Sequence, residues 1–291
     1  MSRPLPICYL NGAYLRLSEA RVSPLDRAFL FGDAVYEVIP VYGGRPFRLR
    51  EHLDRLNRSL AAIRMPAPHS HQDWAAICMQ LVAPCGETDC HIYIQVSRGA
   101  EHGRNHAWPD GLTPTLFAYA TTLDPLPAAM LEHGVSAVTS PDIRWARRDI
   151  KSTALLANIL LKKMAADAGA FETIMLENGE LTEGSSTAVH VISGGVIHTP
   201  PNGHHILPGT TRDVVTELAA RLGMDCSTSR VPEAMLRSAG EIWLSFATRG
   251  VLPVTVLDGK AVGNGKPGPW FVRMHGAFVD LTRELAGRPA L

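Results

Sequence analysis

The five lysines are the first residues to consider, because a primary amine can form a Schiff base with a carbonyl compound. Lysine is scarce in this chain, which has only five among its 28 basic residues. Lys162 and Lys163 fall late in an apolar helical pattern, whereas Lys260 and Lys266 flank glycine-rich turns. Lys151 stands between a charged, strand-like segment and that helical pattern. We expect Lys151 to be partly buried, which lowers the pKa of a lysine, although a surface lysine at a helix start fits the same pattern.

Glu183 is a candidate partner for a ring nitrogen, because it lies between two apolar, strand-like runs. A carboxylate in that context needs a partner, since burying an unpaired charge is costly. If the partner is a pyridine nitrogen, the carboxylate keeps it protonated and strengthens the ring's uptake of electrons. A turn glutamate that faces solvent is the alternative.

Residues 207–212, LPGTTR, have the composition of an anion site at the start of a helix. Backbone N–H groups at a helix N-terminus bind phosphate, and threonine hydroxyls can add to them. The segment is neither a P-loop nor a GxGxxG fingerprint, so it does not indicate generic nucleotide binding. Arg55 lies beside the Leu53 and Leu56 stripe of a predicted helix. It is therefore either a solvated arginine or a guanidinium paired with the same phosphate.

Hydrophobic periodicity predicts the strands and helices that position these residues. Asn11-Gly12 between apolar runs indicates a hairpin, and Gly43-Gly44 follows a predicted strand at 34–42. Further strands are expected at 91–98, 114–121, 134–140, 242–246 and 252–257, and several within 172–197. Helices are expected at 49–63, 72–82, 153–168, 270–285 and in a segment that ends at 223.

The chain is expected to form two domains. A proline-bearing stretch near residues 121–127 has the composition of a linker. We therefore predict an α/β (α+β) fold with a small N-terminal domain at 1–121, a linker at 122–127 and a C-terminal domain at 128–291. Residues 99–112 form a long loop rich in Gly, His and Arg, and loops of this length are often functional.

Composition excludes several classes of function. The 291 residues carry 28 basic and 28 acidic side chains, so no global basic field favours nucleic acid or membrane surfaces. The five cysteines have neither CxxC nor another compact metal-ligand spacing, so no metal site is predicted. The N-terminus lacks the pattern of a signal peptide, and no apolar run approaches the length of a membrane span. We expect a cytoplasmic protein.

Taken together, these motifs resemble the fold-type IV pyridoxal-phosphate enzymes, the family of branched-chain and D-amino acid aminotransferases. The resemblance covers nearly the whole chain and rests on an ordered set: YLNGAYLRLSEARVSPLDRAFLFGDAVYEV, EHLDRL, RRDIKSTALLAN, LTEGSSTAVHVI and LPGTTR. The lysine of DIKS and the glutamate of TEGS have the separation expected of the family. The resemblance implies a small N-terminal α/β domain and a larger C-terminal pseudo-barrel domain that binds pyridoxal phosphate.

The resemblance also implies a role for each matching residue. Lys151 would form the Schiff base with pyridoxal phosphate and move a proton between the substrate Cα and the cofactor's C4′. Glu183 would pair with the pyridine nitrogen, and Leu207 would pack against the ring. The phosphate would be held by the Arg55 side chain, by the backbone N–H groups of Thr210 and Thr211, and by Thr248.

An Arg-x-His pair in the long loop points to the D-amino acid branch. Arg104 and His106 resemble the carboxylate trap of D-amino acid aminotransferases, in which this loop enters the neighbouring subunit's active site. Tyr36, in GDAVYEV, would complete the trap. A guanidinium, an imidazole N–H and a phenol can together bind an α-carboxylate by charge-assisted hydrogen bonds. A polar surface loop is the alternative.

Four positions depart from the family pattern. Pro40 stands where D-amino acid enzymes often carry a lysine, which leaves activity on acidic side chains open. Ala188 replaces a frequent asparagine, and Arg249-Gly250 stands where a small residue and a glutamate are common.

The expected protein is a homodimeric D-amino acid transaminase. It would pass an amino group from a D-alanine-like donor to pyruvate or 2-oxoglutarate in two half-reactions. A branched-chain L-amino acid aminotransferase, an (R)-selective amine transaminase and an aminodeoxychorismate lyase would use the same cofactor residues, so these alternatives stay open. A catalytically inactive protein of the same fold is a further alternative.

Overall fold

The computed structural model describes residues 3–289, which form two compact units. Unit 1 consists of residues 3–124, 150–154 and 282–289, and unit 2 of residues 125–149 and 155–281. The first passage between the units, after Asp124, falls inside the segment predicted as a linker. The segment that carries Lys151 packs with unit 1 although it lies in the second half of the sequence.

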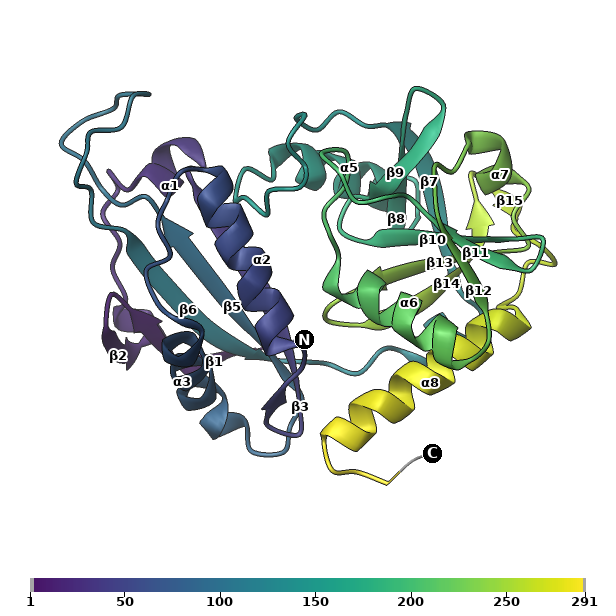
Figure 1. The fold of residues 1–291 in the computed structure, drawn as a ribbon, viewed down its shortest axis with the longest axis horizontal. Helices are drawn as coiled ribbons and strands as arrows, with labels where there is room; N and C mark the ends of the chain where they lie inside the picture. Colours follow the sequence, from purple (N-terminus) through teal and green to yellow (C-terminus); the bar gives the residue numbers. More distant parts are fainter. Residues whose placement is uncertain (1–2, 290–291) are drawn as a thin grey trace. The chain divides into compact units, whose positions relative to one another are not determined.

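Unit 1 is built on a six-stranded antiparallel sheet with two helices on one face (Figure 1). The strands have the order β2-β1-β6-β5-β3-β4. Their bounds are β1 (Pro4–Leu10), β2 (Ala13–Arg16), β3 (Ala34–Tyr42), β4 (Arg45–Pro46), β5 (Cys90–Ser97) and β6 (Thr115–Thr122). The covering helices are α2 (Leu49–Ala62) and α3 (His71–Val82), and a short helix, α1 (Arg27–Phe31), precedes β3.

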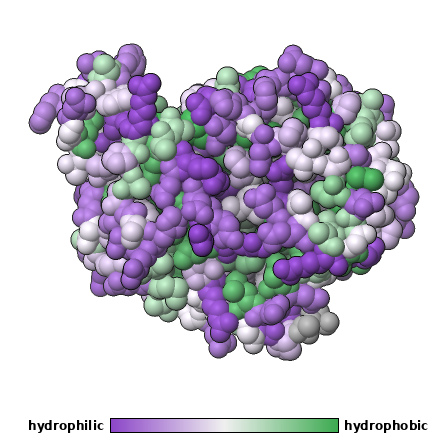
Figure 2. Space-filling model, viewed as in Figure 1, coloured by the Kyte–Doolittle hydropathy of each residue, from purple (hydrophilic) through white to green (hydrophobic). Residues whose placement is uncertain are grey.

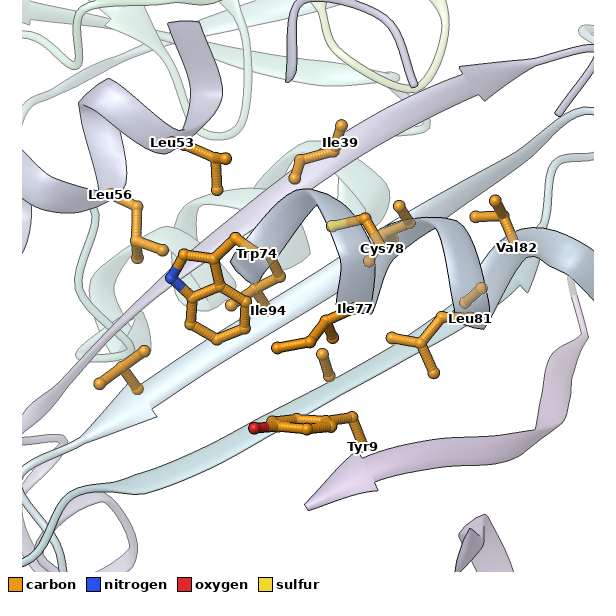
Figure 3. Close-up of a cluster of buried hydrophobic side chains, with 14 of the residues drawn as sticks. Tyr9, Ile39, Leu53, Leu56, Trp74, Ile77, Cys78, Leu81, Val82 and Ile94 are labelled. Atoms are coloured by element: carbon orange, nitrogen blue, oxygen red, sulfur yellow. The ribbon is translucent and has the colours of Figure 1, made fainter. Parts of the chain in front are cut away.

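The core of unit 1 lies between this sheet and the two helices. Side chains alternate between the faces of a strand, so every second residue of β3 and β5 points toward α2 and α3. Ile39 and Ile94 of the sheet lie beside Leu53 and Leu56 of α2 and Trp74 of α3, and all five are buried (Figure 3). Burial of each aliphatic side chain contributes roughly 1.5–3 kcal/mol before the cost in entropy.

The elements predicted for unit 1 are confirmed to within one residue at each end. Asn11 and Gly12 both have positive φ and join β1 to β2, as a two-residue hairpin requires. The prediction omitted α1, whose five residues are too few to show helical periodicity.

Unit 2 is built on a curled, mixed sheet of nine strands (Figure 1). The strands have the order β12-β11-β10-β13-β14-β7-β8-β9, with β15 beside β14. Their bounds are β7 (Val135–Pro141), β8 (Glu172–Glu177), β9 (Glu180–Gly184), β10 (Ala188–Ser193), β11 (Val196–Thr199), β12 (Asp225–Thr228), β13 (Glu241–Phe246), β14 (Gly250–Leu257) and β15 (Lys260–Ala261). Its helices are α4 (Ala128–Glu132), α5 (Leu156–Asp167), α6 (Thr210–Arg221), α7 (Glu233–Arg237) and most of α8 (Pro269–Leu285), which ends in unit 1.

The mixed α/β fold confirms the predicted fold class, with one wrong boundary near the candidate lysine. The helix predicted from residue 153 begins at Leu156. Ser152 forms a β-bridge with Val35, and the Thr153 N–H donates to the Ala34 carbonyl, so both residues lie alongside β3. Within residues 3–289, no helix is both long enough and apolar enough to cross a membrane.

Candidate active site

Lys151 is held against the start of β3 by backbone hydrogen bonds. The Tyr36 N–H donates to the Lys151 carbonyl at 2.9 Å, and the Lys151 N–H donates to the Ser59 hydroxyl at 3.2 Å. The Lys151 Nζ lies 4.3 Å from the centre of the Tyr36 ring. The side chain is partly buried, as predicted. The primary amine is thus fixed above one face of the sheet in unit 1.

The sheet face below Lys151 carries a row of aromatic rings. Tyr36 stacks on Tyr93 of β5 with ring centres 5.7 Å apart, and Tyr93 contacts Tyr119 of β6 at 5.6 Å. The Tyr93 hydroxyl donates to the Gln95 Oε1 at 2.7 Å. Because Tyr36 alternates with the inward-facing Val35 and Glu37, this row lies on the face of the sheet that α2 and α3 do not cover.

Pro40 lies on the same face of β3, four residues after Tyr36. Its carbonyl accepts from the Phe47 N–H at 2.8 Å, beside the short edge strand β4. In an antiparallel strand the N and C=O of one residue point to the same side, so the Pro40 nitrogen faces the sheet edge and interrupts no bond with β5. The fold tolerates proline here, and this position of the face carries no charge.

Arg55 is buried in an ion pair, so its interpretation as a solvated arginine is wrong. Its Nε donates to the Glu37 Oε1 at 2.7 Å and its NH2 to the Glu37 Oε2 at 2.8 Å. The His52 Nδ1 lies 2.8 Å from the same carboxylate. Sequence reasoning missed Glu37, although a charged residue at an inward-facing position of a strand needs a partner and was a usable signal.

We predict that Glu37→Gln destabilises the protein by about 3–5 kcal/mol, because it leaves the Arg55 charge buried and uncompensated. Burial alone would raise the pKa of Glu37, but Arg55 and His52 lower it well below its usual range. A carboxyl group whose pKa is lower in the folded than in the unfolded protein stabilises the fold at pH values above its unfolded-state pKa. That stabilisation is lost as the pH falls through the folded-state pKa. The measurement is denaturant unfolding at neutral pH.

The control is Glu51→Gln, on the exposed side of α2, where Glu51 pairs with Arg48 at the surface. Exposed pairs contribute at most about 1 kcal/mol. Equal effects of the two variants would contradict the buried ion pair.

Glu183 is the last residue but one of β9 in unit 2 and is buried with two partners. Arg144 pairs with its Oε1, and the Leu207 N–H lies 3.2 and 3.1 Å from its two oxygens. Burial raises the pKa of Glu183, and the charge of Arg144 opposes that rise. The solvent-facing alternative for Glu183 is therefore wrong. Gly184 follows because a Cβ there would clash with the Thr187 hydroxyl.

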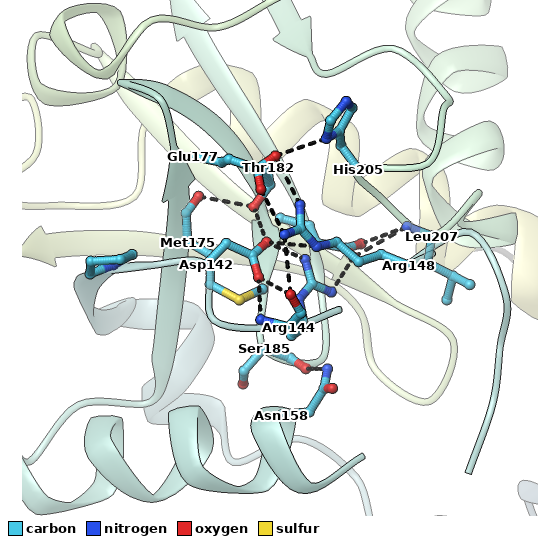
Figure 4. A network of polar contacts seen from close by, with 12 residues as sticks. Asp142, Arg144, Arg148, Asn158, Met175, Glu177, Thr182, Ser185, His205 and Leu207 are labelled. Carbon is cyan, nitrogen blue, oxygen red and sulfur yellow. Dashed lines mark hydrogen bonds and ion pairs between the residues drawn. The ribbon is translucent and has the colours of Figure 1, made fainter. Parts of the chain in front are cut away.

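Arg144 belongs to a chain of alternating charges that ends at an exposed histidine. Its guanidinium binds both oxygens of Asp142, at 3.0 and 2.7 Å. Arg148 lies 3.5 Å from Asp142 and donates twice to Glu177, which also contacts the exposed His205 (Figure 4). Sequence reasoning treated this segment only as charged and strand-like, although its arginines near Asp142 could have suggested ion pairs.

The turn after Glu183 is held by a second buried carboxylate that sequence reasoning missed. Glu172 accepts hydrogen bonds from the hydroxyls of Ser185, Ser186 and Thr187. These hydroxyls therefore position the turn, and with it the end of β9.

The LPGTTR segment forms the N-terminus of α6, as predicted. Gly209 is the N-cap and has no side chain to accept from the first-turn N–H groups, which need acceptors from elsewhere. Thr210 and Thr211 are buried in that turn. Arg212 instead binds the Thr199 hydroxyl and the Pro200 carbonyl, which ties the helix to the preceding loop.

Thr248 lies in the tight turn between β13 and β14 and is partly buried. The neighbouring Gly250 has a φ of +69°, and a Cβ there would lie 2.6 Å from the Phe278 ring. Close packing therefore explains the glycine of the Arg249-Gly250 departure. Ala188 begins β10, where it pairs with Ser245.

Arg104 and His106 lie on the long loop between β5 and β6, which projects away from the sheet of unit 1 (Figure 1). Both side chains are exposed, and both contact the Phe31 ring, at 4.9 and 5.4 Å from its centre. The loop surface is mainly hydrophilic (Figure 2). No carboxylate of residues 3–289 pairs with the Arg104 guanidinium.

We predict that the protein loses stability in mild acid because His190 is buried in β10. Its Nε2 lies 2.9 Å from the Ser245 hydroxyl, and burial, with the nearby Arg212 charge, lowers its pKa to about 3. The unfolded chain takes up this proton below about pH 6.5. The free energy of unfolding therefore decreases by about 1.4 kcal/mol per pH unit as the pH falls from that value toward the pKa of His190 in the folded protein.

The measurement compares wild type with His190→Asn in denaturant at pH 7.5 and 5.5. The wild type should lose about 1.4 kcal/mol more than the variant. His133→Asn, at an exposed position, is the control and should follow the wild type. Parallel losses in wild type and His190→Asn would contradict the assignment.

The side chains of each unit, taken separately, have the chemistry that pyridoxal phosphate needs. Within unit 1, Lys151 is a positioned primary amine of the kind that reacts with an aldehyde. Within unit 2, Glu183 is a buried carboxylate and Gly209 begins a helix without a side-chain cap, and such groups suit a ring nitrogen and a phosphate. No group of His, Cys, Asp and Glu within residues 3–289 has the arrangement of a metal site.

Comparison with known proteins identifies relatives of the chain. Residues 34–257 match the family described as amino-transferase class IV. The chain is 39% identical to the D-alanine aminotransferase of Bacillus licheniformis, over 89% of this chain and 91% of that protein. It is 37% identical to the D-alanine aminotransferase of Listeria innocua, over 93% and 94% of the two chains.

Solved structures show the same fold. The Escherichia coli branched-chain amino acid aminotransferase superposes with a TM-score of 0.89 at 28% identity, covering 95% of this chain and 94% of that one. The T.th. branched-chain amino acid aminotransferase with pyridoxamine 5′-phosphate also gives 0.89, at 26% identity and 97% and 95% coverage.

Proposed function

The chain belongs to the class IV aminotransferase family, and from this premise we propose that it is a D-amino acid transaminase. It transfers the amino group of a small D-amino acid, such as D-alanine, to a 2-oxo acid such as pyruvate or 2-oxoglutarate. The observation that carries the proposal is the placement of Lys151 over Tyr36 in the unit that also bears the Arg104/His106 loop. The D-alanine aminotransferases at 36–39% identity support the same substrate class.

Pyridoxal phosphate, the cofactor of this family, supplies when bound an aldehyde carbon that accepts the amino group and a ring that withdraws electrons from the substrate Cα. We assign its ring nitrogen to Glu183 and one ring face to Leu207. The phosphate is assigned to Arg55, Thr210, Thr211 and Thr248. The bidentate pair between Arg55 and Glu37 keeps that guanidinium fixed rather than mobile.

Lys151 is the catalytic residue in this proposal. Its Nζ would hold the cofactor and would carry the proton between the substrate Cα and the cofactor's C4′. Burial raises the pKa of Glu183, and the charge of Arg144 opposes that rise. In this proposal the Glu183 carboxylate accepts a hydrogen bond from a protonated ring nitrogen.

Arg104, His106 and Tyr36 bind the substrate α-carboxylate in this proposal. Arginine suits the role because its planar guanidinium donates two parallel hydrogen bonds to a carboxylate. The face of β3 beyond Tyr36 presents Val38 and Pro40, neither of which carries a charge. The site therefore favours substrates with small or apolar side chains over acidic ones.

We predict that Arg104→Ala raises KM for D-alanine about 10- to 100-fold, because a hydrogen bond to a charged group contributes roughly 1.5–3 kcal/mol. The affinity for pyridoxal phosphate should not change. The measurement is steady-state kinetics alongside cofactor titration. An unchanged KM would remove Arg104 from the carboxylate site.

A homodimer accounts for the exposed surface around the loop. Leu25 and Phe29 lie close in sequence to Arg27, which binds the loop, and Trp108 belongs to the loop itself; all three are exposed, Phe29 to 77%. Isolated surface leucines are ordinary, but apolar side chains gathered beside a projecting loop indicate contact with another protein. We assign that contact to a second copy of this chain, whose active site receives Arg104 and His106. Sedimentation of the protein and of Phe29→Glu would test this assignment, and a monomeric wild type would contradict it.

We also propose a cytoplasmic location. All five cysteines are free thiols in the structure, and four of them are buried. Free thiols are typical of a reducing compartment.

The visible absorption of the cofactor-loaded protein tests the proposed function. The absorption band should bleach on addition of D-alanine and persist with L-leucine. Bleaching by L-leucine alone would favour a branched-chain L-amino acid aminotransferase, the second candidate, which the likeness to the E. coli structure supports. A band that neither amino acid bleaches would indicate the lyase or amine branch.

A further inference from the structure

Arg27, at the start of α1, is an unusually buried arginine with 3% of its surface exposed. The preceding Asp26 caps α1 by accepting from the Ala28 N–H, and it also accepts from the hydroxyls of Ser97 and Thr115 at the ends of β5 and β6. The backbone that carries Arg27 is therefore fixed to the two strands from which the long loop departs.

The Arg27 guanidinium binds four oxygens, and three of them belong to the loop. Its Nε donates to the Asp33 carboxylate at 2.8 Å, and its NH1 pairs with Glu101. NH1 also donates to the carbonyl of Asn105 at 2.7 Å, and NH2 to the carbonyl of His106 at 3.1 Å. The Arg27 side chain thus hydrogen-bonds to the two backbone carbonyls that immediately follow Arg104.

Asp33 is itself held in place by a second arginine. Arg98 donates to both Asp33 oxygens, at 2.8 and 3.1 Å, and to the Ile63 carbonyl at 2.7 Å. Burial would raise the pKa of Asp33, but the hydrogen bonds from Arg98 and Arg27 lower it. The Arg98 guanidinium also lies 4.0 Å from the centre of the Trp108 ring, farther along the loop.

This arrangement links the substrate-binding loop to the start of β3. Asp33 directly precedes β3, and Tyr36 is the third residue after it. Arg27 therefore connects the backbone at residues 105 and 106 to the start of the strand that carries Tyr36 and contacts Lys151. The loop has no strand or helix of its own between Gly99 and Gly111, so side-chain contacts must set its shape.

We propose that Arg27 is the positioning residue of the substrate-binding loop, which it holds so that Arg104 and His106 are presented in the geometry that binds a carboxylate. The inference rests on the proposed role of that loop. Arg27 makes no direct contact with substrate in this proposal, and it acts through the two carbonyls.

Lysine cannot replace arginine in this role. A guanidinium presents five N–H donors in a rigid plane, whereas an ammonium is a compact charge with three donors on one atom. A lysine at this position would retain the attraction to Asp33 and Glu101 but could not span the two carbonyls as well.

The first experiment compares Arg27→Lys and Arg27→Gln with the wild-type holoenzyme. KM for D-alanine should rise about 10- to 100-fold, because small misplacements of binding groups have effects of that size, while kcat changes far less. Cofactor absorption should be unchanged, which separates positioning from a general loss of structure. The matched control is Arg230→Gln, which removes an exposed pair with Glu180. An unchanged KM, or a loss of cofactor together with activity, would overturn the proposal.

Trypsin gives a readout that does not depend on activity. The bond after Arg104 is a tryptic site next to the carbonyls that Arg27 holds. Cleavage there should accelerate in both Arg27 variants and stay slow in Arg230→Gln. Equal cleavage rates in the wild type and all variants would contradict the proposal that Arg27 positions the loop.

A double variant separates this inference from the proposed function. If Arg27 acts only through the loop, Arg27→Gln should add little to KM in an Arg104→Ala background. Additive effects would overturn the inference and leave the carboxylate role of Arg104 intact. No effect of Arg104→Ala on KM would instead remove the proposed carboxylate site itself.

Discussion

Replacement of Lys151 by alanine is expected to lower the rate of transamination by a factor on the order of 10⁴ or more, because one amine is both the nucleophile and the proton carrier. The hydrogen bonds that hold residue 151 beside Tyr36 and Ser59 involve backbone N–H and C=O groups. Alanine preserves these bonds, so the variant should fold and keep its thermal stability. Single-turnover reaction with D-alanine is the measurement.

Lys260→Ala, at an exposed position of β15, is the matched control and should transaminate at the wild-type rate. Rates like those of the wild type in Lys151→Ala would contradict the mechanism. If Lys151→Ala loses turnover because it does not fold, its melting temperature will show this. Lys151→Arg, which keeps the charge over the Tyr36 ring, would then replace it as the test variant.

Glu183→Gln is expected to lower kcat about 10²–10³-fold, the size of effect seen when one preorganised electrostatic partner is removed from a reaction centre. A neutral amide cannot hold a proton on the ring nitrogen, so the ring withdraws electrons less well. The variant also leaves the Arg144 charge without one of its two carboxylates, and Asp142 becomes its remaining partner. Cofactor should still bind, because Lys151 is intact.

The matched control for this variant is Glu180→Gln, on the same strand and paired with the exposed Arg230. It should leave kcat unchanged. The pre-steady-state rate of the D-alanine half-reaction is the measurement, because it isolates the proton transfer from product release. A rate within about threefold of the wild type would remove Glu183 from the electronic role assigned to it.

Local sequence rules predicted most of the fold because the elements are locally consistent. The Asn11-Gly12 turn, the alternation in β3 and the leucine spacing in α2 each depend on a few neighbouring residues. The predicted start of α5 was wrong because residues distant in sequence determine it. Residues 152 and 153 have a helical sequence context but bond to Val35 and Ala34, more than 100 residues away.

The candidate site was predictable where its residues form motifs and hidden where they form long-range pairs. Lys151 and Glu183 were predicted from their chemical type and from motifs whose separation resembles that of the family. Arg144 meets Glu183 across 39 residues, and Arg27 meets the His106 carbonyl across 79. No periodicity connects such positions, so only the folded backbone shows that these charges are paired.

The three-part composition of unit 1 has a consequence for engineering by recombination. A fragment that ends at Asp124 lacks Ser152, which pairs with β3, and Arg288, which binds the Asp89 carboxylate with two hydrogen bonds at 2.8 and 3.1 Å. Such a fragment is an incomplete module with an open sheet edge. A chimera between relatives should therefore inherit residues 3–124, 150–154 and 282–289 from one parent, so that Lys151 stays together with Tyr36 and the Arg104 loop.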